Sequence, residues 1–225
     1  MLEHGILYFA RADMLGDPFE GAAGIVDRKP KWDEFYRNFF YTSVLTAPSS
    51  ILPKEEADRQ AQQLFEDFEK IRQRKRLSSF VSCWHSGDGE SEALWRLYSP
   101  PQTMGVCIQT DVRSLRESWG DNAHIKLGKV QYIDFREKYA GFYDRIFWKR
   151  KSLSHEAEVR AVLDLHDPRE DMGLHIPVDL NKLLHAVIPS PFAPEWFGVL
   201  VSSVLKRYGI ETKLVASELL LQPFF

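Results

Sequence analysis

The order of strand-like and helix-like segments limits the possible folds of this chain more than any single motif does. Short runs rich in β-branched and aromatic residues, which are typical of strands, are interspersed with runs whose apolar residues recur at helical spacing. The two kinds of segment do not alternate in the regular rhythm of a parallel βαβ sheet. We therefore predict an α+β fold with a single mixed sheet flanked by helices. The expected strands cover residues 6–10, 79–84, 104–110, 125–135, 159–165, 174–178 and 184–188.

Two long helices are expected between the first and second strands. Aromatic residues recur at helical spacing in 32–45, and apolar residues step by four and three in 54–76. The second segment begins with acidic residues and ends with basic ones, as the helix dipole favours. We predict that residues 30–77 form a helical insertion on the sheet and that residues 1–225 form a single domain. Shorter helices are expected at 92–98, 139–151 and 193–207, and after a capping Asp111.

The charge of the chain gives little sign of a nucleic-acid partner. Its 225 residues suffice for one sizeable core, and the net charge is −3. Nucleic-acid-binding proteins usually carry a strongly basic surface, and here the one dense basic run lies at 72–76. We interpret that run as the last turns of a solvated helix rather than as a phosphate-binding patch.

Cysteine usage and hydropathy indicate a protein of a reducing compartment. Cys83 and Cys107 lie in apolar runs expected to be buried strands, and two cysteines in a chain of this length do not form a disulfide framework. No Cys/His spacing suggests zinc, and we assign no metal ligands. The sequence shows neither a signal peptide nor an apolar run near the length of about 20 residues that spans a membrane. We expect a cytoplasmic protein without a membrane partner.

The first candidate site lies at the first expected strand and the turn after it. Tyr8 and Arg11 belong to the strand, and Asp17 and Glu20 belong to the turn. A strand that leads into a turn with two carboxylates is typical of the edge of a cleft. An Asp-Pro pair is also a common way to start a turn, and Glu20 would then be solvated. We favour the turn over the site, and both interpretations stay open.

The second candidate site is the segment 83–86 together with the expected helix 92–98. A cysteine next to a histidine suggests a nucleophile, here Cys83 beside His85. Successive residues of a strand point to opposite faces, so this dyad would need a bend in the chain. Burial also makes a thiol inert. We therefore expect Trp84, His85 and Trp95 to contact a ligand rather than Cys83 to attack one.

The third candidate site is the run 155–160, which reads His-Glu-Ala-Glu-Val-Arg. If residues 156–160 are extended, Glu156, Glu158 and Arg160 share one face of the strand. Two carboxylates on one face need a cation, which Arg160 or the basic run 149–151 can supply. This pattern indicates either a surface ladder of ion pairs, which stabilises little, or a preorganised acid and cation at the mouth of a cleft.

Several short motifs, taken in order, resemble a bacterial and phage family called domain of unknown function 2971. The resemblance covers almost the whole chain, and the family implies no settled activity. Its members usually open with a further short strand, which this chain lacks. The motifs lie at 7–9, 17–20, 82–84, 94–98, 105–108, 130–132, 149, 155–160 and 190–191.

The order of elements is also loosely similar to that of ADP-ribosyltransferases. Those enzymes bind NAD in a split sheet, with a His or Arg on one strand, a hydroxyl or aromatic group on a second and a Glu on a late strand. The Glu can stabilise the cationic ribosyl group of the transition state. The resemblance places Tyr8 on the aromatic strand and Glu156 or Glu158 at the late Glu, and the first position has no match here.

The first functional hypothesis is a nucleotide-handling enzyme that carries out ADP-ribosyl transfer or NAD cleavage, with NAD as substrate. Glu158 would be the key carboxylate and Glu156 its neighbour. Tyr8 or Trp84 would stack on the ligand. Arg160 or Arg11 would contact its phosphates.

Two other hypotheses remain open. One is a non-catalytic module that binds a protein or a small ligand in stress or in phage–host conflict, which the Pro-rich segment 189–194 favours. The other is a metal-dependent hydrolase, because hard divalent cations prefer carboxylate oxygens. Its ligands would be Asp17, Glu20, Glu156 and Glu158.

Overall fold

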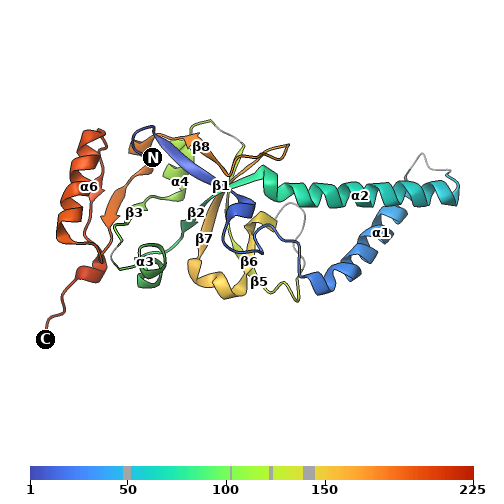
Figure 1. The fold of residues 1–225 in the computed structure, drawn as a ribbon, viewed down its shortest axis with the longest axis horizontal. Helices are drawn as coiled ribbons and strands as arrows, with labels where there is room; N and C mark the ends of the chain where they lie inside the picture. The colour runs from blue at the N-terminus through green and yellow to red at the C-terminus, as the bar shows by residue number, and fades with distance from the viewer. Residues whose placement is uncertain (48–51, 102, 122–123, 139–144) are drawn as a thin grey trace.

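A five-stranded antiparallel sheet lies at the centre of the molecule (Figure 1). The computed structural model describes residues 1–47, 52–101, 103–121, 124–138 and 145–225. The order of strands in the sheet is β4-β7-β2-β1-β8, so neighbours in space are distant in sequence. The bounds are β1 (Ile6–Arg11), β2 (Ser79–His85), β4 (Ile125–Lys129), β7 (Glu158–Asp164) and β8 (Gly173–Pro177).

Two smaller sheets complete the described strands, where the sequence had predicted one sheet. The first has the order β10-β9-β3, and the second pairs β5 with β6 in parallel. The expected strand 125–135 is divided at Val130, whose N–H bonds to the Glu158 carbonyl of the central sheet. The α+β class is nevertheless confirmed. The bounds are β3 (Val106–Gln109), β9 (Ala186–Pro189), β10 (Lys213–Leu214), β5 (Gln131–Ile133) and β6 (Trp148–Arg150).

The two expected long helices are present and form a hairpin that projects from one end of the molecule (Figure 1). We call this hairpin, residues 29–78, the helical arm. Its helices are α1 (Lys29–Leu45) and α2 (Lys54–Ser78), and α6 (Glu195–Arg207) lies at the opposite end. That the whole chain forms one domain stays a prediction.

The short helices follow their sequence signals closely. The helix α3 (Glu92–Tyr98) has the expected bounds, and α4 (Val112–Ser118) begins after Asp111, whose carboxylate accepts the Ser114 N–H at 2.7 Å. The one-turn helix α5 (Leu180–Leu183) was not expected. Within the described part of the chain, no helix is both long and apolar enough to cross a membrane.

The predicted helix 139–151 is wrong over its described part. Residues 139–144 lie outside the described residues, and 145–151 form a 3-10 turn (Arg145–Phe147) followed by β6. The strand β6 pairs with β5, and the Arg145 guanidinium donates a 2.6 Å hydrogen bond to the Arg72 carbonyl. Long-range pairing therefore overrides the local helical pattern, as is common for strands.

The two faces of the central sheet differ in polarity. Leu7 and Phe9 of β1 and Phe80 of β2 point to one face, where they build the main core together with residues of α4 and α5. Cross-strand partners share a face, and Arg160 of β7 pairs with Cys83 of β2. The opposite face, which we call the polar face, carries Arg160 and Cys83 beside a smaller apolar cluster of Ala12, Val81, Ile146 and Val162.

Candidate functional site

Five charged side chains meet on the polar face of the sheet, and we call them the charged cluster: Glu20, Lys149, Glu156, Glu158 and Arg160. They come from the loop before the helical arm, from β6, from a 3-10 helix (Lys151–Glu156) and from β7. None of the five residues is more than 8% exposed. The third candidate site is therefore a buried ion network rather than a surface ladder.

Arg160 lies at the centre of the charged cluster and is 0% exposed. Its Nη1 and Nη2 donate to the two carboxylate oxygens of Glu20 at 2.7 and 2.8 Å, and its Nε donates to Glu158 Oε2 at 2.6 Å. A further bond of 2.7 Å reaches the Ile146 carbonyl. A guanidinium buried in this way positions Glu158, and it offers a ligand phosphate no exposed surface.

Lys149 is the second cation of the cluster and bridges the carboxylates. Its Nζ donates to Glu156 and, at 2.7 Å, to Glu158 Oε1, and it lies 3.5 Å from Glu20 Oε1. Burial acts to lower the pKa of Lys149, but the hydrogen bonds to Glu156 and Glu158 raise it above its usual value. Because three carboxyl groups face two cations, the cluster holds one carboxyl in excess.

The environment shifts the pKa values of Glu156 and Glu158 in opposite directions. Burial and a hydrogen bond that protonated Glu156 donates to the Glu158 carboxylate raise the pKa of Glu156, although Lys149 acts to lower it. Burial also acts to raise the pKa of Glu158, but the hydrogen bond with Glu156 and the charge of Arg160 outweigh it and lower that pKa. A carboxyl pair with separated pKa values is a common basis for acid–base chemistry.

The backbone between these two carboxyls has an unusual conformation. Ala157 has a φ of 41° and a ψ of 52°, and it is the one non-glycine residue at positive φ in the described ranges. The strand β7 therefore begins at Glu158, and the extended segment 156–160 predicted from the sequence is wrong at its first two residues. The turn at Ala157 nonetheless brings both carboxyls to Lys149.

We expect the Ala157→Gly variant to raise the free energy of unfolding by about 0.5–1 kcal/mol. A left-handed alanine costs roughly 1–2 kcal/mol, and the extra freedom of glycine in the unfolded chain offsets roughly half of that gain. Urea unfolding followed by circular dichroism measures the change. A loss of stability would contradict the strain that we infer at this turn.

Three further side chains surround the carboxyl pair. The Glu158 N–H donates to the Tyr132 hydroxyl at 2.8 Å. The Nδ1 of His85 lies 2.8 Å from the Glu156 carbonyl oxygen, which can only accept, so Nδ1 carries the hydrogen when the ring is neutral. Nε2 is then the basic nitrogen. Most of the Tyr98 side chain is exposed to solvent. Partial burial by neighbouring protein atoms and the charge of Glu156 nevertheless raise the pKa of Tyr98.

Cys83 lies on the same face and is exposed, so the predicted burial of Cys83 is wrong, as it is for Cys107. Cys83 is the cross-strand partner of Arg160. Protein atoms crowd around its thiol without covering it, and this partial burial raises the pKa of Cys83 to about 12 despite the charge of Arg160. The thiol is therefore protonated at neutral pH and poorly suited to attack a substrate.

The predicted stacking group Tyr8 also lies on this face. Its ring is half exposed and lies 5.5 Å, between centroids, from the ring of His175 on β8. A Cβ atom at Gly173 would come within 2.2 Å of the Tyr8 ring, so the ring lies over this glycine. In the strand order, β2 lies between β1, which carries Tyr8, and β7, which carries Glu158. Tyr8 is therefore a neighbour of the charged cluster and not a member of it.

The remaining predicted ligand contacts lie elsewhere. Trp84 pairs with Val159 and so points to the apolar face, opposite Glu158. Arg11 donates to the Asp13 carboxylate at 2.6 and 3.1 Å and to the Arg169 carbonyl at 2.5 Å. Trp95 is buried, and its indole N–H donates to the Glu90 carboxylate at 2.7 Å. Packing and internal hydrogen bonds therefore hold all three side chains.

Sequence reasoning missed the full role of two members of the cluster. Glu20 was expected to be a solvated residue of a turn, yet it is 2% exposed and bonded to Arg160. The turn itself is present, since the Asp17 carboxylate accepts the Phe19 N–H at 3.1 Å. Lys149 belongs to the basic run 149–151 and is a motif position of the family resemblance, and neither signal predicts its partners. Motif spacing could not reveal these partners because Glu20 and Arg160 are 140 positions apart.

The carboxylates of the cluster do not form a metal site. Among the described residues, no group of three or more His, Cys, Asp or Glu side chains is arranged to hold a metal ion. Glu20, Glu156 and Glu158 direct their oxygens at Lys149 and Arg160, which occupy the positions that a metal ion would need. Asp17 binds Arg150 instead, at 2.8 Å. The geometry therefore gives the metal-dependent hydrolase no support.

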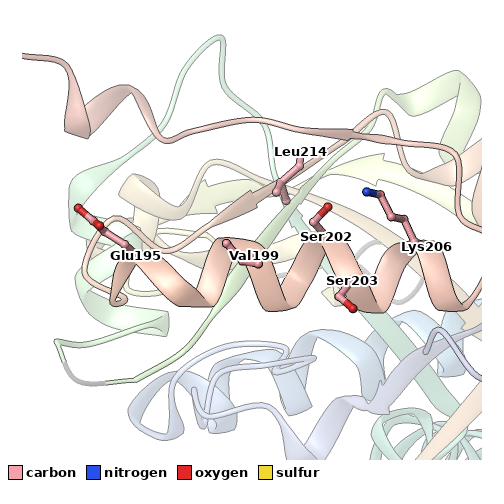
Figure 2. A pocket seen from close by; sticks show the side chains of 7 residues that line it. Glu195, Val199, Ser202, Ser203, Lys206 and Leu214 are labelled. Carbon is pink, nitrogen blue, oxygen red and sulfur yellow. The ribbon is translucent and has the colours of Figure 1, made fainter.

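A separate hollow of about 530 Å³ lies along α6 beside β10 (Figure 2). It shares no residue with the charged cluster. Serine hydroxyls, one lysine, one glutamate and apolar side chains line it. These residues are Glu195, Gly198, Val199, Ser202, Ser203, Lys206 and Leu214.

Comparison with known proteins gives no guide to the interpretation of the site. No protein-family model, curated protein or solved structure matches the chain at a significant level. The resemblance to the domain of unknown function 2971 family and the looser similarity to ADP-ribosyltransferases therefore stay predictions. The geometry of the charged cluster is the basis for a functional proposal.

Proposed function

We propose that the charged cluster is the active centre of an enzyme that acts on a nucleotide-like substrate, most concretely by ADP-ribosyl transfer or NAD cleavage. The observation that carries the proposal is the pair Glu156 and Glu158, whose pKa values are shifted in opposite directions. Ionised Glu158 would face the developing positive charge of a ribosyl group. Arg160 and Lys149 would hold that carboxylate in place.

Each group then has a distinct role in the reaction. The glycosidic C–N bond breaks, and its electron pair leaves with nicotinamide, which becomes neutral and needs no proton. Glu158 stabilises the ribosyl cation. The acceptor hydroxyl or water attacks the ribosyl carbon and passes its proton to Glu156, which acts in its ionised form at this step and whose raised pKa makes it the stronger base of the pair. His85 Nε2 and the Tyr98 ring lie beside the pair and are placed to contact the substrate.

The test compares variants of the full chain at matched concentration. We expect Glu158→Gln to lower the rate of NAD consumption by about 100- to 1,000-fold, as removal of one charge-stabilising group commonly does. Mass spectrometry of NAD, nicotinamide and ADP-ribosylated protein measures the rate. The control is Glu170→Gln, which makes the same chemical change at an exposed carboxylate.

Folding must be separated from catalysis because Glu158 is buried among cations. Glu156→Gln serves as the second variant, since an amide resembles the protonated acid and can still accept a hydrogen bond from Lys149. We expect it to keep the native circular dichroism spectrum and to lose turnover. If the wild-type chain neither binds nor consumes NAD, the proposal fails.

A second candidate function is a non-catalytic binding module. The observation that favours it is the apolar surface of α6, where Trp196, Val199 and Leu200 are all about half exposed or more. This helix directly follows the Pro-rich segment 189–194 and carries the hollow of Figure 2. A stoichiometric partner that binds without turnover, and that is lost on Trp196→Ala, would support this function over the enzyme.

A further inference from the structure

One side of the helical arm exposes large apolar side chains from both of its helices. Phe35 and Phe39 of α1 and Leu64 and Ile71 of α2 are between 44 and 53% exposed. The contact between the two helices is made by other residues. The Phe68 ring lies 4.6 Å from the Tyr36 ring and 5.6 Å from the Phe40 ring, between centroids.

The four exposed side chains lie on the same side of the arm. Arg37 of α1 donates to Gln62 of α2 at 2.7 Å and marks one flank of the hairpin. At about 100° per residue, Phe35 and Phe39 lie roughly 160° around α1 from Arg37. Leu64 and Ile71 lie roughly 160–180° around α2 from Gln62. Both pairs therefore lie on the flank opposite the Arg37–Gln62 bond, and we call them the apolar flank.

The charges of α2 change sign along its length. Its first turns carry Glu55, Glu56 and Asp58, and its last turns carry a run of basic residues. On the outer edge of the apolar flank, Glu56 lies near one end of the helix and Arg74 near the other. Both are exposed, and in the described part of the chain neither makes an ion pair. A helix with this pattern is complementary to a second copy of itself that runs antiparallel.

We propose that the apolar flank binds the apolar flank of a second copy of this chain, so that two helical arms form an antiparallel four-helix bundle. A two-fold axis near residue 65 of α2 places Glu56 opposite Arg74 of the second copy, and Gln60 opposite its Lys70. Such an interface is isologous, with the same patch on both subunits. A pair of helical hairpins packed through apolar faces is the usual build of a four-helix bundle.

Two features of the molecule favour this arrangement over a parallel one. The sheets lie at one end of the arm (Figure 1), so an antiparallel pairing places the two sets of sheets at opposite ends, clear of each other. A second surface hollow of about 300 Å³ lies on α2 between Glu56, Arg59, Gln60 and Gln63. The antiparallel pairing directs Lys70 and Arg74 of the second copy toward this hollow. A parallel pairing would bring like charges together.

The first test is the mass of the full chain in solution by sedimentation equilibrium. We expect twice the chain mass of 26.1 kDa at micromolar concentration. The variant Phe39→Glu places a charge in the apolar flank and should weaken the dimer at least about 100-fold. Because Phe39 is exposed, the monomer should keep its helical circular dichroism signal. The control Asn38→Glu adds the same charge one residue away, on the outer side of α1, and should leave the mass unchanged.

A charge exchange tests the antiparallel register. Glu56→Arg should weaken the dimer about tenfold, because it replaces two attractive contacts with two repulsive ones. Arg74→Glu should do the same, and the double variant should restore the dimer. A wild-type chain that stays monomeric at micromolar concentration overturns the proposal. So does a dimer that Phe39→Glu leaves intact, or a double variant that is no tighter than either single one.

Discussion

Replacing Arg160 with methionine should lower the free energy of unfolding by about 3–5 kcal/mol, the usual cost of removing one partner of a buried ion pair. The guanidinium makes three charged hydrogen bonds to Glu20 and Glu158 and one to a carbonyl, with no solvent contact. Methionine fills part of the space but leaves Glu20 and Glu158 buried, and among the described residues Lys149 is then the one cation that contacts them. Unfolding by guanidinium chloride at fixed pH, followed by tryptophan fluorescence, measures the change in free energy.

The matched control for this variant is Arg96→Met. Arg96 also pairs with a carboxylate, Glu92, through bonds of 2.6 and 2.9 Å, but both side chains are more than half exposed. Solvent screening limits such a pair to roughly 0.5 kcal/mol. A Glu20→Gln variant combined with Arg160→Met should cost less than the sum of the two single changes. Equal losses for Arg160→Met and Arg96→Met would contradict the burial of the cluster.

The second large effect concerns two neighbours in β1 that point to opposite faces of the sheet. We expect Phe9→Ala to cost about 3–5 kcal/mol of stability, as truncation of a buried phenylalanine usually does. Phe9 is 0% exposed, and its ring meets the Trp119 ring edge-on at 6.5 Å between centroids. Tyr8→Ala should cost under about 1 kcal/mol, because Tyr8 is 51% exposed and a surface residue has little packing to lose.

The same pair of variants separates folding from function. Under the stacking role that the sequence predicts for Tyr8, Tyr8→Ala keeps its stability and weakens NAD binding, while Phe9→Ala loses stability first. Thermal unfolding and calorimetric titration with NAD measure the two properties. Equal losses of stability for Tyr8→Ala and Phe9→Ala would contradict the exposed position of the Tyr8 ring.

The elements that could be predicted are those with a strong local pattern. The bounds of α3 match residue by residue, and α2 ends two residues beyond the predicted 54–76. Both have apolar residues at helical spacing and clear signals at their ends. The segment 145–151 failed because its conformation depends on pairing with β5 and on Arg72, which lies far away in sequence. The single sheet failed for a similar reason, since strand pairing is not a local property.

Only the residues of the candidate site that lie close together in the sequence could be predicted. Strand alternation correctly placed Glu158 and Arg160 on one face, and the run at 149–151 correctly offered a cation. The same reasoning could not find Glu20, because a loop residue shows its partner only when the fold is complete. Exposure was the least predictable property. Cys83 lies in an apolar run, yet the strand that carries it has one face open to solvent at that position.

The charged cluster also has a consequence for the kinetics of folding. It joins segments spread between residues 20 and 160, and each charge is costly to remove from water until its partners are in place. We therefore expect the cluster to close late, after the strands of the central sheet have paired. Interactions that form after the transition state act on the rate of unfolding and leave the rate of folding nearly unchanged. We expect the network at Arg160 to lengthen the lifetime of the folded protein more than it speeds folding.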